Sequence, residues 1–419
     1  MRLRFSLFLL FFLVIANKLV AQQNHEIPIA KIHGDTSTKK PKRDTTILSK
    51  KGKPQTDLYE VISRWLDENA KPADDTVTSK PVISVVPAIG YTLVSRFAIV
   101  LSGNVAFRTG PESRVSSIVA STSYTQNKQF SIPIQTSIWS RDNRYNFIGD
   151  YRFYKYPQST FGLGSSSKMD NDDPMDYKFI RFYETAYRRL TGNFYAGLGY
   201  MLDTHYDITD KGNLNGAIAD YERYGKSAHS IASGFNVSTL YDSRDNGLNA
   251  SRGALVSLTY RTAMRGLGST ENWNSLMVDA RKYFKFPAGS ENVIALWNFD
   301  WVVLNGSPAY LDLPSLSWDS NSATGRGYIQ GRFRGAQMFY GEAEYRFKIT
   351  GNGLIGGVVF GNLSTFSAAQ GSKLQAIQPG YGPGLRIKLN KVSKTNISLD
   401  YGFGNQGSHG LFIDVGEAF

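Results

Sequence analysis

A group of charged residues in the C-terminal third of the sequence is the first candidate for chemistry. The stretch "GRGYIQGRFRGAQMFYGEAEYRFKI" covers residues 325–349 and places Arg326 between two glycines. Glu344 follows in the same stretch, and Asp400 lies in a later one of similar pattern. The planar guanidinium of an arginine contacts carboxylates in a bidentate manner that lysine cannot match. These residues predict a buried ion-pair site, with a solvated loop arginine as the simpler alternative.

Motifs for catalysis or for metal binding are nearly absent from the sequence. The five histidines are scattered, and none has the spacing of a two-histidine metal site. No nucleophile elbow and no phosphate-binding glycine loop occurs. The acidic run Met169–Asp176 lacks the order of a calcium-binding loop, so we interpret it as a polar surface loop. We expect no enzymatic activity, no cofactor and no metal site.

The N-terminus predicts export from the cytoplasm. Arg2 and Arg4 precede an apolar run from Phe5 to Ala16, and Ala21 is a small residue suited to cleavage. The run is shorter than the roughly 20 residues that a membrane-spanning helix needs, so we interpret residues 1–21 as a secretory signal peptide. The exported chain contains no cysteine, which excludes disulfides and thiolate metal sites.

Residues 22–80 read as a periplasmic tether that contains one helix. The basic run 31–53 contributes to the net charge of +12 and is interpreted as a solvated tail, while export argues against a nucleic-acid partner. The segment "TDLYEVISRWLDENA" predicts an amphipathic helix near residues 57–70. Its apolar face would carry Leu58, Val61, Ile62 and Trp65. A single helix needs a surface to lie against, which could be a membrane rim, the main domain or a separate periplasmic partner.

From Pro81 to Phe419 the apolar residues recur at every second position. In "MFYGEAEYRFKI" and "NISLDYGF" the aromatic and aliphatic residues take the odd positions, and charged residues such as Glu344 and Asp400 take even ones. In "VIALWNFDWVV" the apolar residues of 293–303 alternate with Asn298 and Asp300. This alternation predicts strands with one apolar face and one charged face.

Two folds accommodate such strands: a soluble sandwich and a transmembrane barrel. In a sandwich the apolar face is the core, whereas in a barrel it faces lipid and the charged face lines the lumen. The aromatic content of 13% and the alternation of tight turns with long polar loops favour the barrel. At roughly 20 residues per strand and turn, residues 81–419 predict an all-β, antiparallel transmembrane barrel of about 16 strands.

If the even positions face the lumen, Glu344 and Asp400 are inward carboxylates on the wall. Arg326 precedes the Glu344 strand, so a connection folded back into the lumen would bring its guanidinium to one or both of them. Gly325 and Gly327 would allow the backbone to approach the wall closely.

A second group of polar residues lies in "YDSRDNGLNASRG", at positions 241–253. We expect a rigid connection between two strands here, because Asp and Asn side chains bind turn N–H groups and glycine allows unusual dihedral angles. The residues concerned are Asp242, Arg244, Asp245, Asn246 and Gly253.

Several stretches, taken in order, resemble the BamA/TamA family of outer-membrane barrels, also called the bacterial surface antigen family. The stretches are "PAIGY", "SYTQNKQF", "YDSRDNGLNASRG", "GRGYIQGRFRG", "EAEYRF", "GPGLRI", "LDYGFG" and the terminal "EAF". The likeness covers essentially all of residues 81–419. It implies a 16-stranded barrel in the bacterial outer membrane, among relatives that insert or translocate other proteins.

The resemblance also implies roles for single residues. Arg326, Gly327 and Tyr328 match the Arg-Gly-aromatic tip of a loop that folds into the lumen, while Glu344 and Asp400 match carboxylates on the wall. Phe419 matches an aromatic residue that ends the last strand and serves as a C-terminal strand signal. The first and last strands would be weakly paired, so that their edges template incoming strands.

Two departures from the family pattern change what is expected. Residues 22–80 show no periplasmic POTRA repeat, so the chain is predicted to be a short member without them. Val359 stands where many relatives have Asp, which predicts an altered lumen charge network. The expected function is insertion, assembly or translocation of proteins, with unfolded outer-membrane proteins as clients and the lipid bilayer as surroundings. A passive pore, or a structural or binding barrel, is the alternative.

Overall fold

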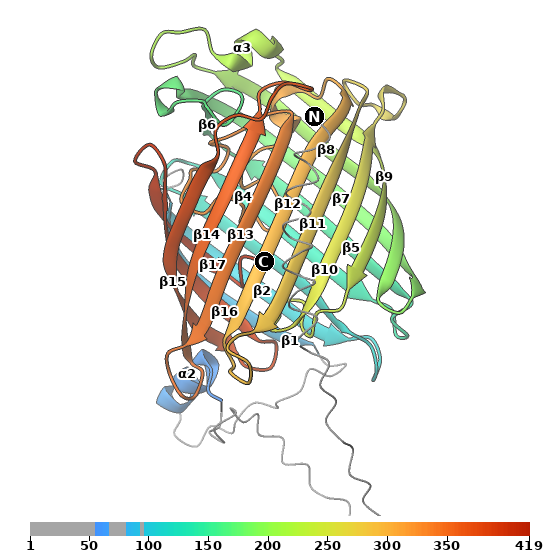
Figure 1. Ribbon diagram of the computed structural model, residues 1–419, viewed down its shortest axis with the longest axis vertical. Coiled ribbons are helices and arrows are strands. Elements are labelled where there is room, and N and C mark those ends of the chain that lie inside the picture. The colour runs from blue at the N-terminus through green and yellow to red at the C-terminus, as the bar shows by residue number, and fades with distance from the viewer. Residues whose placement is uncertain (1–54, 67–80, 93–95) are drawn as a thin grey trace, which may run out of the picture. The chain divides into compact units, whose positions relative to one another are not determined.

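The computed structural model describes residues 55–66, 81–92 and 96–419. A β-barrel dominates these residues, and a short helix, α2 (Leu58–Leu66), lies at one end of it (Figure 1). The predicted signal peptide, residues 1–21, and the basic run 31–53 lie outside the described residues. No helix within the described part of the chain combines the length and the apolar character needed to cross a membrane.

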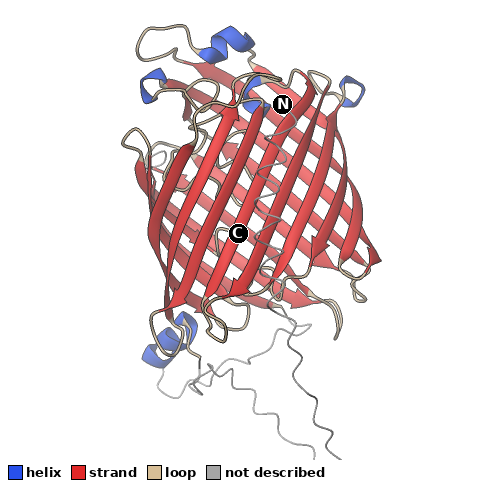
Figure 2. Cartoon of the chain, viewed as in Figure 1, coloured by secondary structure: helices blue, strands red, loops and turns tan. Residues whose placement is uncertain are grey.

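Antiparallel strands form the wall of the barrel (Figure 2). Their bounds are β1 (Val82–Thr92), β2 (Arg96–Arg108), β3 (Val115–Thr125), β4 (Phe130–Trp139), β5 (Tyr145–Lys155), β6 (Gln158–Thr160), β7 (Asp173–Thr191), β8 (Phe194–Asp210), β9 (His229–Asp242), β10 (Gly253–Ala263), β11 (Trp273–Lys285), β12 (Val293–Gly306), β13 (Gln337–Lys348), β14 (Ile355–Ser367), β15 (Gln378–Asn390), β16 (Thr395–Gly404) and β17 (His409–Val415).

Each wall strand pairs with the next one along the chain, as a simple up-and-down barrel requires. β5 and the short β6 both pair with β7, so β6 continues β5 and the described strands occupy sixteen positions around the wall. The predicted fold class, an antiparallel barrel of about 16 strands, is confirmed.

The two ends of the barrel differ in their connections. One end has short turns and holds α2, while the other has the long connections 161–172, 211–228 and 307–336. Short helices lie in these and neighbouring loops: η1 (Met169–Asn171), α3 (Asp220–Gly225), η2 (Arg265–Leu267) and η3 (Tyr310–Asp312). Outer-membrane barrels place their short turns in the periplasm, so we call the α2 end the periplasmic end.

Outward-facing apolar residues cover the wall, as the alternation predicts for a barrel in lipid. Leu198 on β8 exposes 68% of its surface and Tyr381 on β15 exposes 62%. Glu344 on β13 and Asp400 on β16, at inward positions, expose only 2% and 3%. The hydrophobic side of this protein is therefore its outside.

On β12 the assignment of faces from the sequence is wrong. Trp297 pairs with Glu342 and Ala295 pairs with Glu344 across the β12–β13 ladder, and directly opposed residues share a face. The apolar odd positions of β12 therefore point into the lumen, and Asn298 shares the other side of the strand with Asp300, to which it donates a 2.7 Å hydrogen bond. The alternation gives the period of a strand, but it does not say which face meets lipid.

The inverted face of β12 has a physical cause in the lumen. The connection 307–336 folds inward and brings apolar side chains that need apolar neighbours. The buried residues that pack together here include Trp297, Tyr340, Leu316, Trp318, Tyr328, Phe333 and Phe366. The lumen thus has an aromatic core beside its charged residues, and β12 supplies one wall of that core.

Candidate functional site

The candidate site is built on the lumen loop, which we define as residues 307–336 between β12 and β13. Within it the Asp319 carboxylate accepts hydrogen bonds from the N–H (2.9 Å) and the hydroxyl (2.7 Å) of Thr324. The N–H of Leu316 donates to the carbonyl oxygen of Phe333 at 3.0 Å and draws the two halves of the loop together. The loop is therefore folded upon itself inside the barrel before its tip meets the wall.

Arg326 at the tip of the lumen loop is held by three carboxylates. Its guanidinium donates to Glu342 and Glu344 on β13 and to Asp400 on β16. The ring of Phe360 on β14 lies beneath the guanidinium, with 3.9 Å from Cζ to the ring centroid. Arg326 is 3% exposed. The structure brings together Arg326 and both predicted carboxylates and adds a third, Glu342.

The glycines beside Arg326 allow the loop to touch the wall. Gly325 and Gly327 have φ angles of +81° and +108°, which residues with a side chain rarely adopt. A Cβ on Gly327 would lie 2.6 Å from the carbonyl oxygen of Phe403, and one on Gly402 would lie 2.5 Å from the Gly327 nitrogen. Backbone packs directly on backbone here, so a side chain on either glycine would push the tip away from β16.

Tyr328, the aromatic residue of the tip, fastens the loop on the other side of Arg326. Its hydroxyl donates to the carbonyl oxygen of Pro379 at 2.5 Å and accepts from the N–H of Asn405 at 2.9 Å. The Ser408 hydroxyl donates to the carbonyl oxygen of Gly327 at 2.8 Å. The tip therefore bridges β15, β16 and the connection 405–408, close to the last strand.

The charges around Arg326 extend into a larger network. Arg346 Nε donates to Glu344 at 2.6 Å, and Arg386 donates to Asp400 at 2.5 Å and to Glu417 at 2.7 Å. We call the set the lumen cluster: Arg326, Arg346, Arg386, Glu342, Glu344, Asp400 and Glu417. Four carboxylates face three guanidinium groups, so each arginine is shared.

Burial makes the lumen cluster sensitive to the loss of any member. Moving ions out of water costs several kcal/mol each, and this cost is offset only where every charge has partners in good geometry. Removing one arginine would leave carboxylates buried without compensation. The cluster consequently behaves as one unit that ties the lumen loop to β13, β15 and β16.

The position predicted for Phe419 needs correction, because it does not end a strand. β17 ends at Val415, and the following residues turn into the lumen. The Phe419 ring stacks on Trp297 with centroids 5.0 Å apart, and a main-chain oxygen of Phe419 accepts a 3.0 Å hydrogen bond from Arg346. Glu417 joins the lumen cluster. Aromatic packing and ion pairs inside the barrel thus draw the tail away from the wall.

The predicted turn motif forms the connection 243–252 between β9 and β10. The Asp242 carboxylate accepts from the N–H and from Nε of Arg244, both at 3.0 Å. Gly253 has φ +99°, and a Cβ there would lie 2.2 Å from the carbonyl oxygen of Ser243. The motif therefore shapes the connection through its own side chains.

The other two side chains of the motif bind backbone N–H groups of the same turn. Asn246 accepts from the N–H groups of Leu248 and Asn249, both at 2.8 Å. Asp245 accepts from the N–H of Ser251 at 2.8 Å. Burial disfavours its charge, but the hydrogen bonds from Ser251 prevail and lower the pKa of Asp245 below its usual value. Asn249 also reaches Glu417 at 3.3 Å, which joins the turn to the lumen cluster.

Val359 does not alter the lumen charge network, contrary to the expectation from the sequence. Val359 lies on the outer face of β14 and exposes 50% of its surface. The next residue, Phe360, faces inward and packs against Arg326. A carboxylate at position 359 would meet lipid in this register, so the valine suits its place.

The first and last strands meet at what we call the seam, the junction of β1 and β17. The two strands approach each other, yet no ladder of pairs between them is found among the described residues. Near the periplasmic end of β1, the hydroxyl of Tyr59 from α2 accepts from the N–H of Val85 at 2.9 Å and donates to its carbonyl oxygen at 3.1 Å. In an antiparallel strand both groups of one residue point to the same neighbour. Tyr59 therefore caps the free edge of β1.

Sequence reasoning missed four members of the lumen cluster and the capping tyrosine. Glu342 and Arg346 stand at even positions of the same strand as Glu344, so the alternation in the sequence already indicated that they face the lumen. Arg386 alternates with apolar residues in "GLRIKL" in the same way. Glu417 follows the end of β17, where parity no longer applies, and nothing in the sequence links Tyr59 to β1. Within the described residues no group of His, Cys, Asp or Glu is placed to hold a metal ion.

The fold and the site together define the class of protein. A sixteen-position antiparallel barrel with an apolar outer face, a charged lumen and an inward-folded loop is an outer-membrane β-barrel protein. Residues 112–419 match the model of the Omp85 superfamily domain, and the chain belongs to that superfamily. Its location is the bacterial outer membrane.

Solved structures of similar fold agree with this assignment. One is BamA from Haemophilus ducreyi lacking POTRA domains 1–3, with 13% identity and a TM-score of 0.50 over 81% of this chain and 69% of that chain. Another is CdiB from Acinetobacter baumannii, with 13% identity and a TM-score of 0.51 over 80% of this chain and 60% of that chain. At this identity the likeness concerns the fold. No curated protein sequence matches the chain.

Replacing Arg326 tests whether the lumen cluster holds the barrel together. We expect Arg326→Ala to lower the free energy of unfolding by about 3–5 kcal/mol, because three buried carboxylates lose their shared partner. Arg326→Lys should recover only part of the loss, since an ammonium lacks the planar fork. The measurement is urea unfolding in lipid vesicles, with the heat-resistant folded band on gels as a second readout.

The matched control is Arg265→Ala in an exposed loop. Arg265 pairs with Glu271 at 2.6 Å, but its side chain is 62% exposed, so little change in stability is expected. Equal effects of the Arg326 and Arg265 substitutions would contradict a structural role for the lumen cluster.

Removing the Tyr59 hydroxyl tests the cap on β1. We expect Tyr59→Phe to free the N–H of Val85 and to speed its amide hydrogen exchange about fivefold, as the loss of a hydrogen bond worth ~1 kcal/mol implies. Tyr345→Phe is the control, because its hydroxyl binds Asn292 at 2.7 Å and does not touch β1. Unchanged exchange at Val85 in Tyr59→Phe would show that the cap is not formed.

Proposed function

We propose that this protein inserts or translocates other proteins at the outer membrane, with unfolded outer-membrane proteins as its clients. Membership of the Omp85 superfamily supports this class of function. In the proposed mechanism, backbone N–H and carbonyl groups of this chain form hydrogen bonds with a client strand. No catalytic step and no cofactor takes part.

The observation that carries the proposal is the free edge of β1 at the seam. Val85 directs its N–H and carbonyl to a tyrosine hydroxyl instead of to another strand. Unpaired backbone groups in lipid cost several kcal/mol each, so a strand that pairs with them gains stability. Strand addition to such an edge is a general mode of peptide binding. A client strand would displace the Tyr59 cap and pair with β1.

The course of the tail that follows β17 also supports the seam as the place where a client strand would pair. Because Glu417 and Phe419 turn inward, the wall on the β17 side of the seam stops at Val415. β1 begins at Val82, on the same periplasmic side. An incoming strand would meet β1 at this end first and would displace the Tyr59 cap there.

The packing of the lumen makes a passive pore the less favoured function. The lumen loop fills the barrel with a buried aromatic core that includes Trp318, Tyr328 and Phe333. Its tip is tied to the wall through Arg326. Passage through the lumen would require this loop to leave, whereas strand addition at the seam leaves it in place.

Depletion of the protein from its own bacterial host tests the proposed function. We expect the amounts of other barrel proteins, or of a secreted client, to fall in the outer membrane while their synthesis continues. Expression of the intact gene from a plasmid should restore them. Unchanged amounts of all outer-membrane and secreted proteins after depletion would overturn the proposal.

Photocrosslinking tests the seam as the site of action. We expect a benzoylphenylalanine in place of Ile83, an outward residue of β1 that is 65% exposed, to capture newly made outer-membrane proteins. The matched position is Leu198 on β8, which is 68% exposed and also faces outward. Capture at both positions alike would show general contact with membrane proteins and would contradict a specific role of β1.

A further inference from the structure

The helix α2 presents an apolar face that the barrel does not cover. Residues spaced by three and four positions share one side of a helix. In α2 these are Leu58, Val61, Ile62 and Trp65. Val61 is 40% exposed, Ile62 is 46% exposed and Trp65 is 83% exposed. Soluble helices turn such a face inward, so its exposure here requires an explanation.

The polar side of α2 and the residues that precede it fix the orientation of the helix. Asp57 caps the helix by accepting from the N–H of Glu60 at 2.8 Å, and it also accepts from the N–H of Lys391 at 2.9 Å. The Lys391 ammonium pairs with Glu60 at 3.4 Å, and the N–H of Thr56 donates to the carbonyl oxygen of Asn352 at 3.2 Å. The helix is fastened to two periplasmic turns, and these contacts leave the apolar side free.

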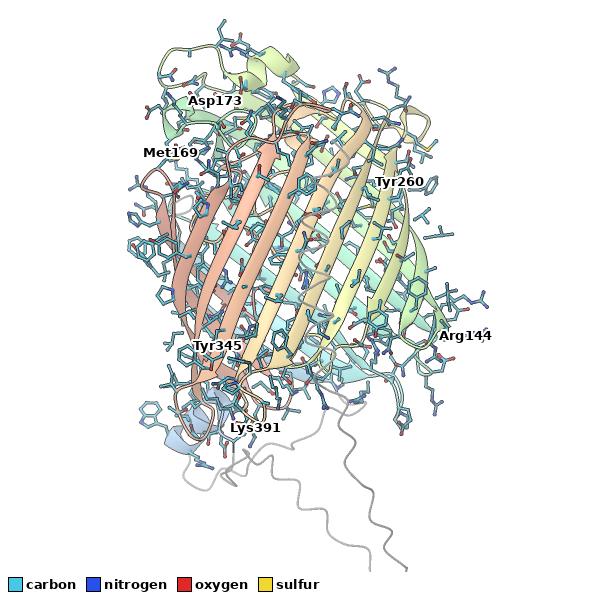
Figure 3. The ribbon with its side chains drawn as sticks, viewed as in Figure 1. Arg144, Met169, Asp173, Tyr260, Tyr345 and Lys391 are labelled. Atoms are coloured by element: carbon cyan, nitrogen blue, oxygen red, sulfur yellow. The ribbon has the colours of Figure 1, made fainter. Side chains whose placement is uncertain are left out.

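The surroundings of α2 belong to the lipid-facing wall. Figure 1 places α2 at the periplasmic rim, at the lower end of β14 to β16, and Figure 3 labels Lys391 beside it. Outward apolar residues stand at the same end of the barrel. Ile349, in the turn that holds Thr56, is 57% exposed, and Ile83 and Val85 on β1 are 65% and 50% exposed. The exposed apolar face of α2 and exposed apolar residues of the wall therefore lie at the same end of the barrel.

We propose that Leu58, Val61, Ile62 and Trp65 dock into the periplasmic leaflet of the outer membrane. The bilayer already surrounds the barrel wall beside α2, so the helix meets lipid without a further partner. Tryptophan favours the interface between headgroups and acyl chains, and an amphipathic helix lies in that plane with its apolar side buried. The docking surface is therefore the lipid boundary at the foot of the barrel.

Docking of α2 into lipid would also affect the seam, and this effect goes beyond the proposed function. Tyr59 lies next to Leu58 in α2 and caps Val85 of β1. A helix held by lipid on one side and by Lys391 and Asn352 on the other keeps the Tyr59 hydroxyl on the edge of β1. Release of α2 from the leaflet would uncover that edge, so the membrane itself acts on the seam through this helix.

Single labelled cysteines in the full-length protein, refolded into phospholipid vesicles, test the proposal. The chain has no cysteine of its own, so each introduced thiol is unique. Variants Trp65→Cys and Val61→Cys place a fluorophore on the apolar face, and the second keeps Trp65 intact. Ser63→Cys is the matched control, because Ser63 is exposed and lies on the opposite side of the helix. The heat-resistant band on gels verifies that each barrel is folded.

The expected result is a difference between the two faces of α2. Brominated lipids should quench the labels at positions 61 and 65 several-fold more than the label at position 63, while aqueous iodide should show the reverse order. Equal quenching by iodide at all three positions in a folded barrel would overturn the proposal and would leave a periplasmic protein as the occupant of this face. Because purified protein and lipid suffice, failure here is distinguishable from failure of the proposed insertion function.

Discussion

The rest of the structure depends on one constraint, which is that backbone hydrogen-bonding groups in lipid must find partners within the protein. Sixteen wall positions satisfy one another in sequence from β1 to β17, and the apolar side chains are left to face outward. The seam is where this arrangement is weakest, because β1 and β17 are far apart in the chain and no turn sets their register. At Val85 a side chain from α2 supplies the missing partner. The stability of the wall and the proposed strand addition therefore depend on the same backbone groups.

The constraint also explains why the charges of the lumen cluster lie inside. With lipid on the outer face, the lumen is where charged side chains can be kept, and there they need partners because the lumen loop excludes much of the water. Arg326 meets that need for Glu342, Glu344 and Asp400 at once. The same contacts place the loop tip against β16, next to β17 in the wall. The contacts of one guanidinium thus hold the lumen loop inside the barrel and tie it to β13 and β16.

The sequence predicted the features that follow from local periodicity and failed for those that depend on packing. The alternation along β13 and β16 placed Glu344 and Asp400 correctly, because the charged residues of each strand all stand on one face. On β12 both faces contain residues that suit either side, and only the aromatic core of the lumen loop decides that Trp297 points inward.

The position of Phe419 could not be predicted from the sequence. Only the folded structure shows that Trp297 and Arg346 lie close enough to bind it inside the barrel. For Val359 the family resemblance predicts a change in the lumen charges, but its register on β14 turns the side chain outward. The hydrogen bonds between Tyr59 and Val85 could not be predicted, because no periodic pattern in the sequence links the two residues.

Two sets of contacts lie beside the seam, one in the lumen and one at the periplasmic rim. Inside, the tail with Glu417 and Phe419 is held by Arg386, Arg346 and Trp297, and this removes a stretch of backbone that would otherwise continue β17. At the periplasmic rim, Tyr59 of α2 caps the edge of β1 at Val85. The contacts in the lumen are buried ion pairs and aromatic packing, and their loss would disturb the whole lumen cluster. The contacts of α2 at the exposed rim are a few hydrogen bonds, and each contributes about 1 kcal/mol. The Tyr59 cap is consequently the contact that would open while the barrel stays folded, and under the proposed function a client strand would reach β1 there.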